Sequence, residues 1–204
     1  MTTFYIVRHG ETHWNVQQLM QGHGDSPLTE AGKNQARDLT VTFAPIKFDY
    51  VFSSDLLRAK HTAELLTIEK ELAVKTTELL RERSFGKYEG KSREQFEAEN
   101  RELIAKFTSL SEAEKHTFKY APDMSSDEEV VTRLLTFLRE TAVAYPDKTI
   151  LAVTHGGVFR VLLKHLGKPI KWGRGTIKNA AYIILESDGM EFDLKKTEGI
   201  EFDT

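Results

Sequence analysis

The chain has 204 residues, of which 40% are hydrophobic and 29% are charged, as in an ordinary soluble globular protein. A formal net charge of −3 excludes a global basic field for nucleic acid or an anionic membrane. The absence of cysteine excludes disulfides, thiolate catalysis and zinc–cysteine sites. The N-terminus has no signal-peptide pattern and no apolar run is long enough to span a bilayer, so we expect a cytoplasmic protein.

Three short apolar runs predict buried strands, at residues 4–7, 50–52 and 149–153. None of them alternates strictly between apolar and polar residues, which is typical of a sheet that is covered on both faces. Two further runs, at 182–185 and 190–194, flank Ser187-Asp188-Gly189. They predict an antiparallel hairpin with an Asp-Gly turn at one edge of the sheet.

Apolar residues at helical spacing fall between these strands, at about 29–43, 56–66, 127–142 and from Gly156 onward. Thr29 is expected to cap the first helix, and Ser126 or Asp127 the third. The alternation of strands and helices predicts an α/β sandwich with a mainly parallel sheet.

The segment at about 88–122 does not fit this alternation. It is strongly charged and carries Phe96, Leu103, Ile104 and Phe107 at helical spacing. We therefore expect one domain, residues 1–204, with an inserted helical lid that folds over one end of the sheet.

Three polar motifs each follow a predicted strand, and the carboxyl ends of strands are where open α/β sheets bind ligands. Arg8 and His9 follow the first, Arg58 the second, and His155 the third. A neutral imidazole can attack phosphorus, and a guanidinium can hold the phosphoryl oxygens. His155 stands at a glycine-rich turn that opens a helix, where backbone amides also favour an anion. The three motifs together predict a site for phosphoryl transfer.

Each motif alone also has a structural explanation. A histidine at a strand end or in a glycine turn can simply bond to the main chain. Arg58 can instead pair with Asp55 or Glu64 on its own helix.

Phosphoryl transfer to histidine also needs an acid that protonates the leaving alkoxide. Glu82, within Arg81-Glu82-Arg83, is preferred for this role. The sequence alone does not separate it from Glu78 and Glu89.

Two smaller features follow His9. Asn15 can donate an amide hydrogen to phosphate, and a loop that begins at Gln21-Gly22 can line the cleft. The remaining histidines have no metal-ligand spacing, so we expect no metal and no cofactor.

Taken together, Arg8-His9-Gly10-Glu11-Thr12, Arg58, Glu82 before Phe85-Gly86, and His155-Gly156-Gly157 resemble the histidine phosphatase superfamily, the phosphoglycerate mutase-like group. The resemblance runs from the first strand to the last. It implies a three-layer α/β/α sandwich and a reaction in two steps, transfer to the first histidine and hydrolysis. It also implies roles for particular residues: His9 as the phosphorylated residue; Arg8, Arg58, His155 and Asn15 around the phosphate; Glu82 as the proton donor; and Gln21, Gly22, Arg83, Phe85 and Gly156 as substrate contacts.

The resemblance covers both phosphatases and mutases. The stretch from Gly90 to Asp127 has no Arg-Arg pair, which cofactor-dependent mutases use to clamp the substrate carboxylate, and the chain is short for a mutase. Met124-Ser125-Ser126 replaces the Gly-Glu-Ser of many family phosphatases. The resemblance therefore does not define that part of the substrate pocket, although it still covers the phosphate site. The sequence thus favours a metal-independent phosphomonoesterase acting on a small phosphorylated metabolite, as a monomer or homodimer. The alternatives are a cofactor-dependent phosphoglycerate mutase and a phosphoprotein-binding regulatory module.

Overall fold

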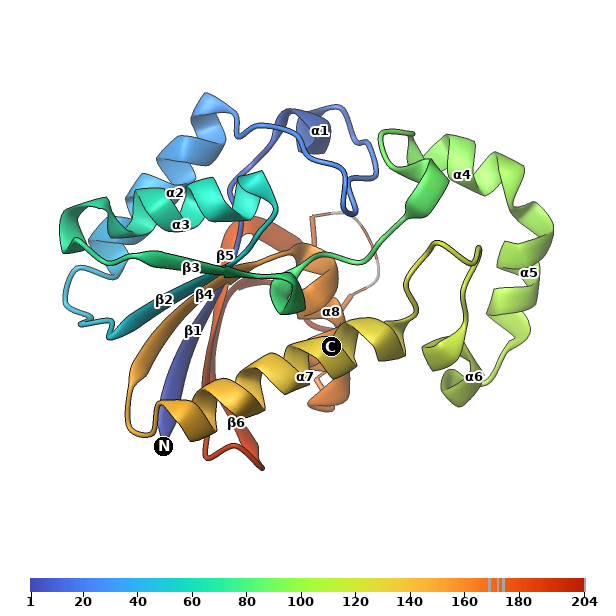
Figure 1. Cartoon of the computed structure of the whole chain (residues 1–204). Coiled ribbons are helices and arrows are strands. Elements are labelled where there is room, and N and C mark those ends of the chain that lie inside the picture. Colours follow the sequence, from blue (N-terminus) through green and yellow to red (C-terminus); the bar gives the residue numbers. More distant parts are fainter. Residues whose placement is uncertain (169, 172, 174, 204) are drawn as a thin grey trace.

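The computed structural model describes residues 1–168, 170, 171, 173 and 175–203, and these residues form one six-stranded sheet in the order β3-β2-β4-β1-β5-β6 (Figure 1). The four strands from β3 to β1 are parallel, and β5 and β6 add an antiparallel hairpin beside β1. The strand bounds are Thr2–Arg8 (β1), Tyr50–Ser54 (β2), Val74–Thr77 (β3), Thr149–Thr154 (β4), Ile177–Ser187 (β5) and Phe192–Ile200 (β6). The predicted edge hairpin and the mostly parallel centre are confirmed.

Helices pack on both faces of this sheet (Figure 1). One face is covered by α2 (Glu30–Thr42) and α3 (Leu57–Thr67), and the other by α7 (Asp127–Ala144) and α8 (Gly156–His165). In β4, Ile150 faces the α7–α8 side and Leu151 faces the α2–α3 side, and both side chains are fully buried. Because both faces are apolar, the central strands read as continuous apolar runs. The three-layer α/β/α sandwich is confirmed.

Local sequence signals set where two of these helices begin. The side chain of Thr29 accepts a hydrogen bond from the amide of Gly32 at the start of α2. Ser126 and Glu129 form a reciprocal capping box at the start of α7. Of the two predicted caps for this helix, Ser126 is therefore the one used.

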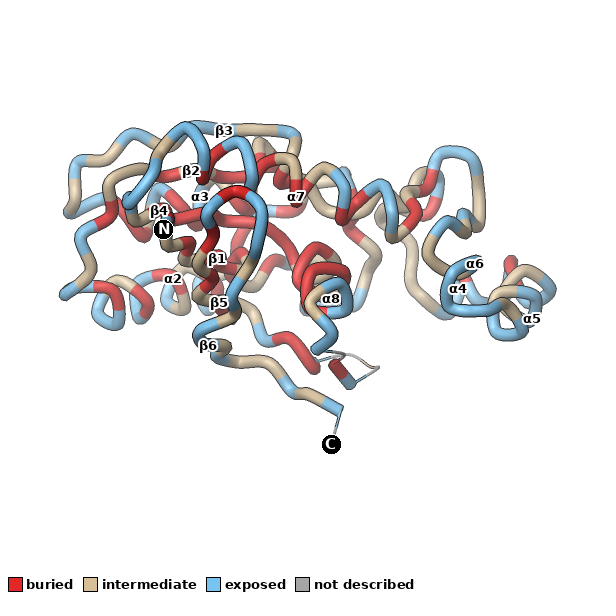
Figure 2. The backbone as a smooth tube through the Cα atoms, turned by 90° about the horizontal axis from the view of Figure 1, so that it is seen from below, coloured by how far each residue is buried: buried red, intermediate tan, exposed pale blue. Residues whose placement is uncertain are grey.

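The segment after β3 forms three short helices, α4 (Arg93–Glu99), α5 (Arg101–Ser109) and α6 (Glu112–Thr117). They lie to one side of the sheet and are mostly exposed (Figure 2). A small apolar cluster, centred on Tyr88, Phe96 and Met124, holds the ends of this insertion together. The helical character expected for residues 88–122 is present.

Short elements complete the chain: α1 (His13–Val16) after β1, and 3-10 turns at Ile68–Lys70, Glu78–Leu80 and Gly86–Tyr88. The strand β3, an edge strand with two exposed central residues, was not predicted. The strand β5 begins earlier than predicted, at Ile177, because Ala180 has a φ of 57° and the pairing with β6 is irregular between Ile177 and Tyr182. No helix in the described part of the chain is long and apolar enough to cross a membrane.

Candidate active site

A pocket of about 680 Å³ lies at the carboxyl ends of the parallel strands. Arg8 and His9 reach it from the end of β1, Arg58 from the start of α3, and Gly156 from the start of α8. Glu82, in the segment after β3, lines the same pocket. The structure thus brings together polar residues that are far apart in the sequence.

His9 is held in a single tautomer. The residue is only 3% exposed, and Nδ1 lies 2.7 Å from the main-chain oxygen of Gly10. Because a carbonyl oxygen can only accept, Nδ1 carries the proton and Nε2 of the neutral ring keeps its lone pair. Burial, followed by the positive charges of Arg58 and Arg8, lowers the pKa of His9 well below 6.5. At neutral pH His9 is therefore a neutral imidazole with one nitrogen available.

His155 lies beside His9, with the two ring centroids 5.2 Å apart. The side chain is fully buried, and neither ring nitrogen has a hydrogen-bond partner among the described residues. Burial and the charge of Arg58 lower the pKa of His155 well below 6.5, so this ring is also neutral. A buried polar atom without a partner is costly, and the protonated ring nitrogen can donate to an anionic oxygen.

Arg58 is fully buried, and its guanidinium is held by the loop at residues 22–25. Nη1 donates to the carbonyl of Gly24 at 2.7 Å and to Asp25 at 3.1 Å, and Nη2 donates to the carbonyl of Gly22 at 2.7 Å. Nε has no partner in the described part of the protein. The sequence alternative, pairing with Asp55 or Glu64, is wrong, because the buried guanidinium pairs with Asp25.

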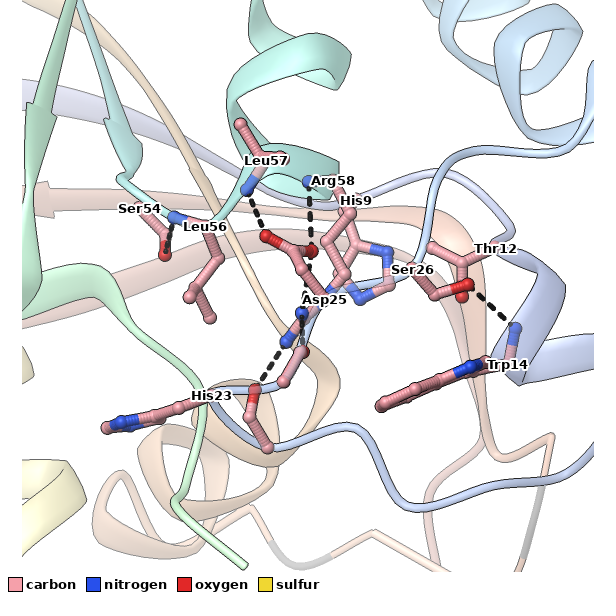
Figure 3. A network of polar contacts seen from close by, with 12 residues as sticks. His9, Thr12, Trp14, His23, Asp25, Ser26, Ser54, Leu56, Leu57 and Arg58 are labelled. Atoms are coloured by element: carbon pink, nitrogen blue, oxygen red, sulfur yellow. Dashed lines mark hydrogen bonds and ion pairs between the residues drawn. The ribbon is translucent and has the colours of Figure 1, made fainter. Parts of the chain in front are cut away.

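The carboxylate of Asp25 also completes the start of α3 (Figure 3). It accepts from the main-chain amides of Leu57 and Arg58, whereas the N-cap residue Leu56 supplies no side-chain bond. Asp25 therefore fixes the first turn of α3 and the side chain of Arg58 together.

Arg8 lines the pocket between β1 and α8. Its Nη1 donates to the carbonyl of Ile177, while Nε is buried without a partner in the described chain. A Cβ added to Gly156 would lie only 3.2 Å from this Nε. Burial lowers the pKa of Arg8 to about 10, so it remains charged at neutral pH. Arg8 and Arg58 thus keep two positive charges beside two neutral histidines.

The structure separates the three candidates for the proton donor. Glu82 lines the pocket, and its Oε2 accepts from the amide of Gly157 at 2.9 Å. Glu78 is exposed and pairs with Arg81. Glu89 accepts instead from main-chain amides of the neighbouring loops. Only Glu82 of these three carboxylates lies in the pocket.

The remaining site residues expected from the sequence divide into two groups. Asn15, Gln21, Gly22 and Phe85 line the pocket. Arg83 does not: its guanidinium pairs with Asp127 and donates to the carbonyl of Ser125. Within the described ranges, no three histidine or acidic side chains are grouped as a metal ion would need.

Several residues that were not predicted from the sequence also line the pocket: Trp14, Gln35, Arg93, Arg160 and Asn179. Asn179 donates from Nδ2 to the main-chain oxygen of His9 at 3.3 Å and to Oδ1 of Asn15 at 3.2 Å. Arg93 comes from the inserted helices, so the insertion forms part of the pocket wall. These residues lie outside any motif, and only the folded chain reveals them.

Comparison with known proteins shows to which family this chain is related. The family model for the histidine phosphatase superfamily (branch 1) matches residues 4–198. "Uncharacterized phosphatase PhoE" of Bacillus subtilis is 32% identical over 166 residues, 81% of this chain and 78% of that protein. A 2,3-bisphosphoglycerate-dependent phosphoglycerate mutase of Cytophaga hutchinsonii is 30% identical over 82% of this chain and 78% of its own length. The solved structure of Bacillus stearothermophilus YhfR superimposes with a TM-score of 0.83 at 29% identity and covers 98% of each chain. The chain therefore belongs to the histidine phosphatase superfamily.

Proposed function

We propose that the protein is a metal-independent phosphomonoesterase that hydrolyses a small phosphorylated metabolite through a phosphohistidine on His9. The observation that carries the proposal is the protonation of His9 together with the charged and polar groups around it. Its Nδ1 is fixed by Gly10, its ring is neutral, and His9 lines the pocket together with Arg8 and Arg58. The ring of His155, which is fully buried and does not line the pocket itself, lies beside that of His9. This is the arrangement that in-line attack on phosphorus needs.

In the first step, the lone pair of Nε2 of His9 forms a bond to phosphorus as the bond to the ester oxygen breaks. Glu82, when protonated, gives its proton to the leaving oxygen, so that the product is an alcohol. Arg8, Arg58 and one N–H of His155 stabilise the negative charge on the phosphoryl oxygens.

In the second step, the carboxylate of Glu82 accepts a proton from a water molecule whose oxygen attacks phosphorus. The P–N bond breaks, its electron pair returns to Nε2 of His9, and inorganic phosphate leaves. Glu82 is then protonated again and ready for the next ester.

The relatives include both phosphatases and a mutase, so the alternative is a phosphoglycerate mutase that needs a bisphosphoglycerate primer. The lack of an arginine pair between Gly90 and Asp127 supports the phosphatase. A pocket of about 680 Å³ with a wall from the insertion supports a small substrate over a phosphoprotein.

The test is a panel of phosphomonoesters, including phosphoglycerates, incubated with the purified protein. The proposal expects release of inorganic phosphate and an acid-labile phosphoryl label that is absent from the His9→Ala variant. Isomerised phosphoglycerate would establish the mutase instead. Label on the His9→Ala variant, or no turnover of any ester, would refute the mechanism.

A further inference from the structure

The loop at residues 22–25 contacts both Arg58 and the segment that carries Glu82. From this arrangement we infer that His23 is a positioning residue, which holds the proton donor Glu82 in place relative to Arg58. The inference rests on the proposed function, because it requires Glu82 to protonate the leaving group.

On one side the loop is fastened to the phosphate-binding arginine. The carbonyls of Gly22 and Gly24 accept from the guanidinium of Arg58. The carboxylate of Asp25 accepts from it as well (Figure 3). Asp25 also accepts from the amides at the start of α3. Any displacement of the loop therefore disturbs a fully buried cation.

On the other side the loop is fastened to the segment that carries the acid. Nε2 of His23 lies 2.9 Å from the main-chain oxygen of Glu82, and because a carbonyl only accepts, the ring nitrogen donates. Glu89 adds a second link, since it accepts from the amides of His23 at 2.8 Å and Phe85 at 3.0 Å. The approach is tight: a Cβ on Gly22 would lie 2.3 Å from the carboxylate of Glu89.

The contact with His23 bears on the carboxyl group through one peptide plane. The main-chain oxygen of Glu82 and the amide of Arg83 belong to the same planar unit. That amide donates to Oε1 of Glu82 at 2.8 Å. By holding the oxygen of this unit, His23 holds the amide that orients the acid.

A second donor, Arg133 on α7, binds the same main-chain oxygen of Glu82. Arg133 on α7 donates from Nη2 to the oxygen of Glu82 at 2.9 Å and from Nη1 to that of Leu79 at 3.2 Å. Arg133 ties the segment to the helical layer, and His23 ties it to the loop that holds Arg58. His23 is exposed, so its replacement leaves the core of the fold in place.

The test compares kcat for two substrates that differ in leaving group, glycerol phosphate and p-nitrophenyl phosphate. The alkoxide needs a proton to leave, whereas p-nitrophenolate does not. We expect His23→Ala to lower kcat for glycerol phosphate roughly 3- to 10-fold more than for p-nitrophenyl phosphate, the effect of one net hydrogen bond. His23→Gln should restore the rate, because its side-chain amide can donate from a similar position. His61→Ala, an exposed histidine on α3, is the matched control and should change neither rate.

An equal loss with both substrates, or failure of His23→Gln to restore the rate, would overturn the positioning role. The Glu82→Gln variant separates this result from a failure of the proposed function. If that variant is selectively slow with glycerol phosphate and His23→Ala is not, only the role of His23 falls. If the wild-type protein hydrolyses no ester of the phosphomonoester panel, the proposed function is wrong, and so is the role of His23 that rests on it.

Discussion

The main-chain amide of Gly157 donates a 2.9 Å hydrogen bond to Oε2 of Glu82. This bond joins the turn that carries His155 to the proposed acid. A Cβ at Gly157 would lie 2.3 Å from Oε1 of Glu82, the mobile end of a side chain. We therefore expect Gly157→Ala to displace the carboxylate while the protein stays folded. Its kcat for alkyl phosphates should fall about 10-fold more than for p-nitrophenyl phosphate, since misplaced acid groups lose much of their effect.

The neighbouring glycine is the matched control for this variant. A Cβ at Gly156 would meet Nε of Arg8 at 3.2 Å, on the phosphate side of the pocket. Gly156→Ala should therefore lower kcat by the same factor for alkyl phosphates and for p-nitrophenyl phosphate. If Gly157→Ala shows the same uniform loss, the hydrogen bond from Gly157 does not orient the acid.

Replacing Glu82 by Gln keeps the size of the side chain and removes the transferable proton. Loss of a general acid typically costs roughly 10²- to 10⁴-fold, and we expect this range for kcat with alkyl phosphates. The loss with p-nitrophenyl phosphate should be much smaller, because that leaving group needs no proton. Steady-state kinetics with the two substrates measure the difference. Equal losses would remove Glu82 from the role of acid.

The low pKa of His9 should appear as a dependence of stability on pH. Unfolded His9 takes up a proton below about pH 6.5, whereas the buried ring in the folded protein stays neutral. The unfolded state thus binds more protons, and folding stability falls with acid, by up to about 1.4 kcal/mol per pH unit for this group. The contribution is lost as the pH drops below 6.5 toward the pKa in the folded protein.

His9→Ala removes this group, so its free energy of unfolding should fall less steeply than that of wild type between pH 7 and pH 5. Urea denaturation at several pH values measures both slopes. Parallel curves for His9→Ala and wild type would show that the ring of His9 titrates normally in the folded protein.

The parts of the structure that the sequence predicts are those with local signals. Thr29 and Ser126 cap their helices through residues three positions away, and Ile150 and Leu151 belong to an apolar run that marks a strand covered on both faces. The histidine and arginine motifs follow these strands directly, which places them at one edge of the sheet.

The parts that the sequence does not predict depend on contacts between distant segments. Asp25 precedes its partner Arg58 by 33 positions, and Asn179 reaches His9 across 170 positions. Neither residue stands in a recognisable motif. Arg83 fits the family pattern for a substrate contact, yet its guanidinium pairs with Asp127. Such pairings are decided by tertiary packing and leave no periodic trace in the chain.

The reaction should proceed without a metal ion, because Arg8 and Arg58 already supply positive charge to the pocket beside His9. Both guanidinium groups remain charged at neutral pH. We expect the rate of phosphate release to be unchanged after dialysis against a chelator and on addition of Mg²⁺ or Zn²⁺. A loss on chelation that a divalent ion restores would contradict this expectation.

The pair formed by Asp25 and Arg58 should be important for stability, unlike the exposed ion pairs of this protein. The side chain of Arg58 is fully buried and that of Asp25 is 24% exposed. Removing one partner of a buried pair costs about 3–5 kcal/mol. The carbonyls of Gly22 and Gly24 would still satisfy part of the guanidinium. We therefore expect Asp25→Ala to lower the free energy of unfolding by about 2–4 kcal/mol.

Two further variants identify the cause of that loss in urea denaturation. Asp25→Asn keeps an oxygen for the amides at the start of α3 but loses the charge, so its stability should lie between those of Asp25→Ala and wild type. Asp147→Ala removes an ion pair with the N-terminus in which the aspartate side chain is 84% exposed, and the loss of stability should be much smaller than that of Asp25→Ala, because solvent screens exposed pairs. If Asp25→Ala is as mild as Asp147→Ala, the loop carbonyls alone suffice to hold Arg58, and Asp25 is not needed to keep that charge buried.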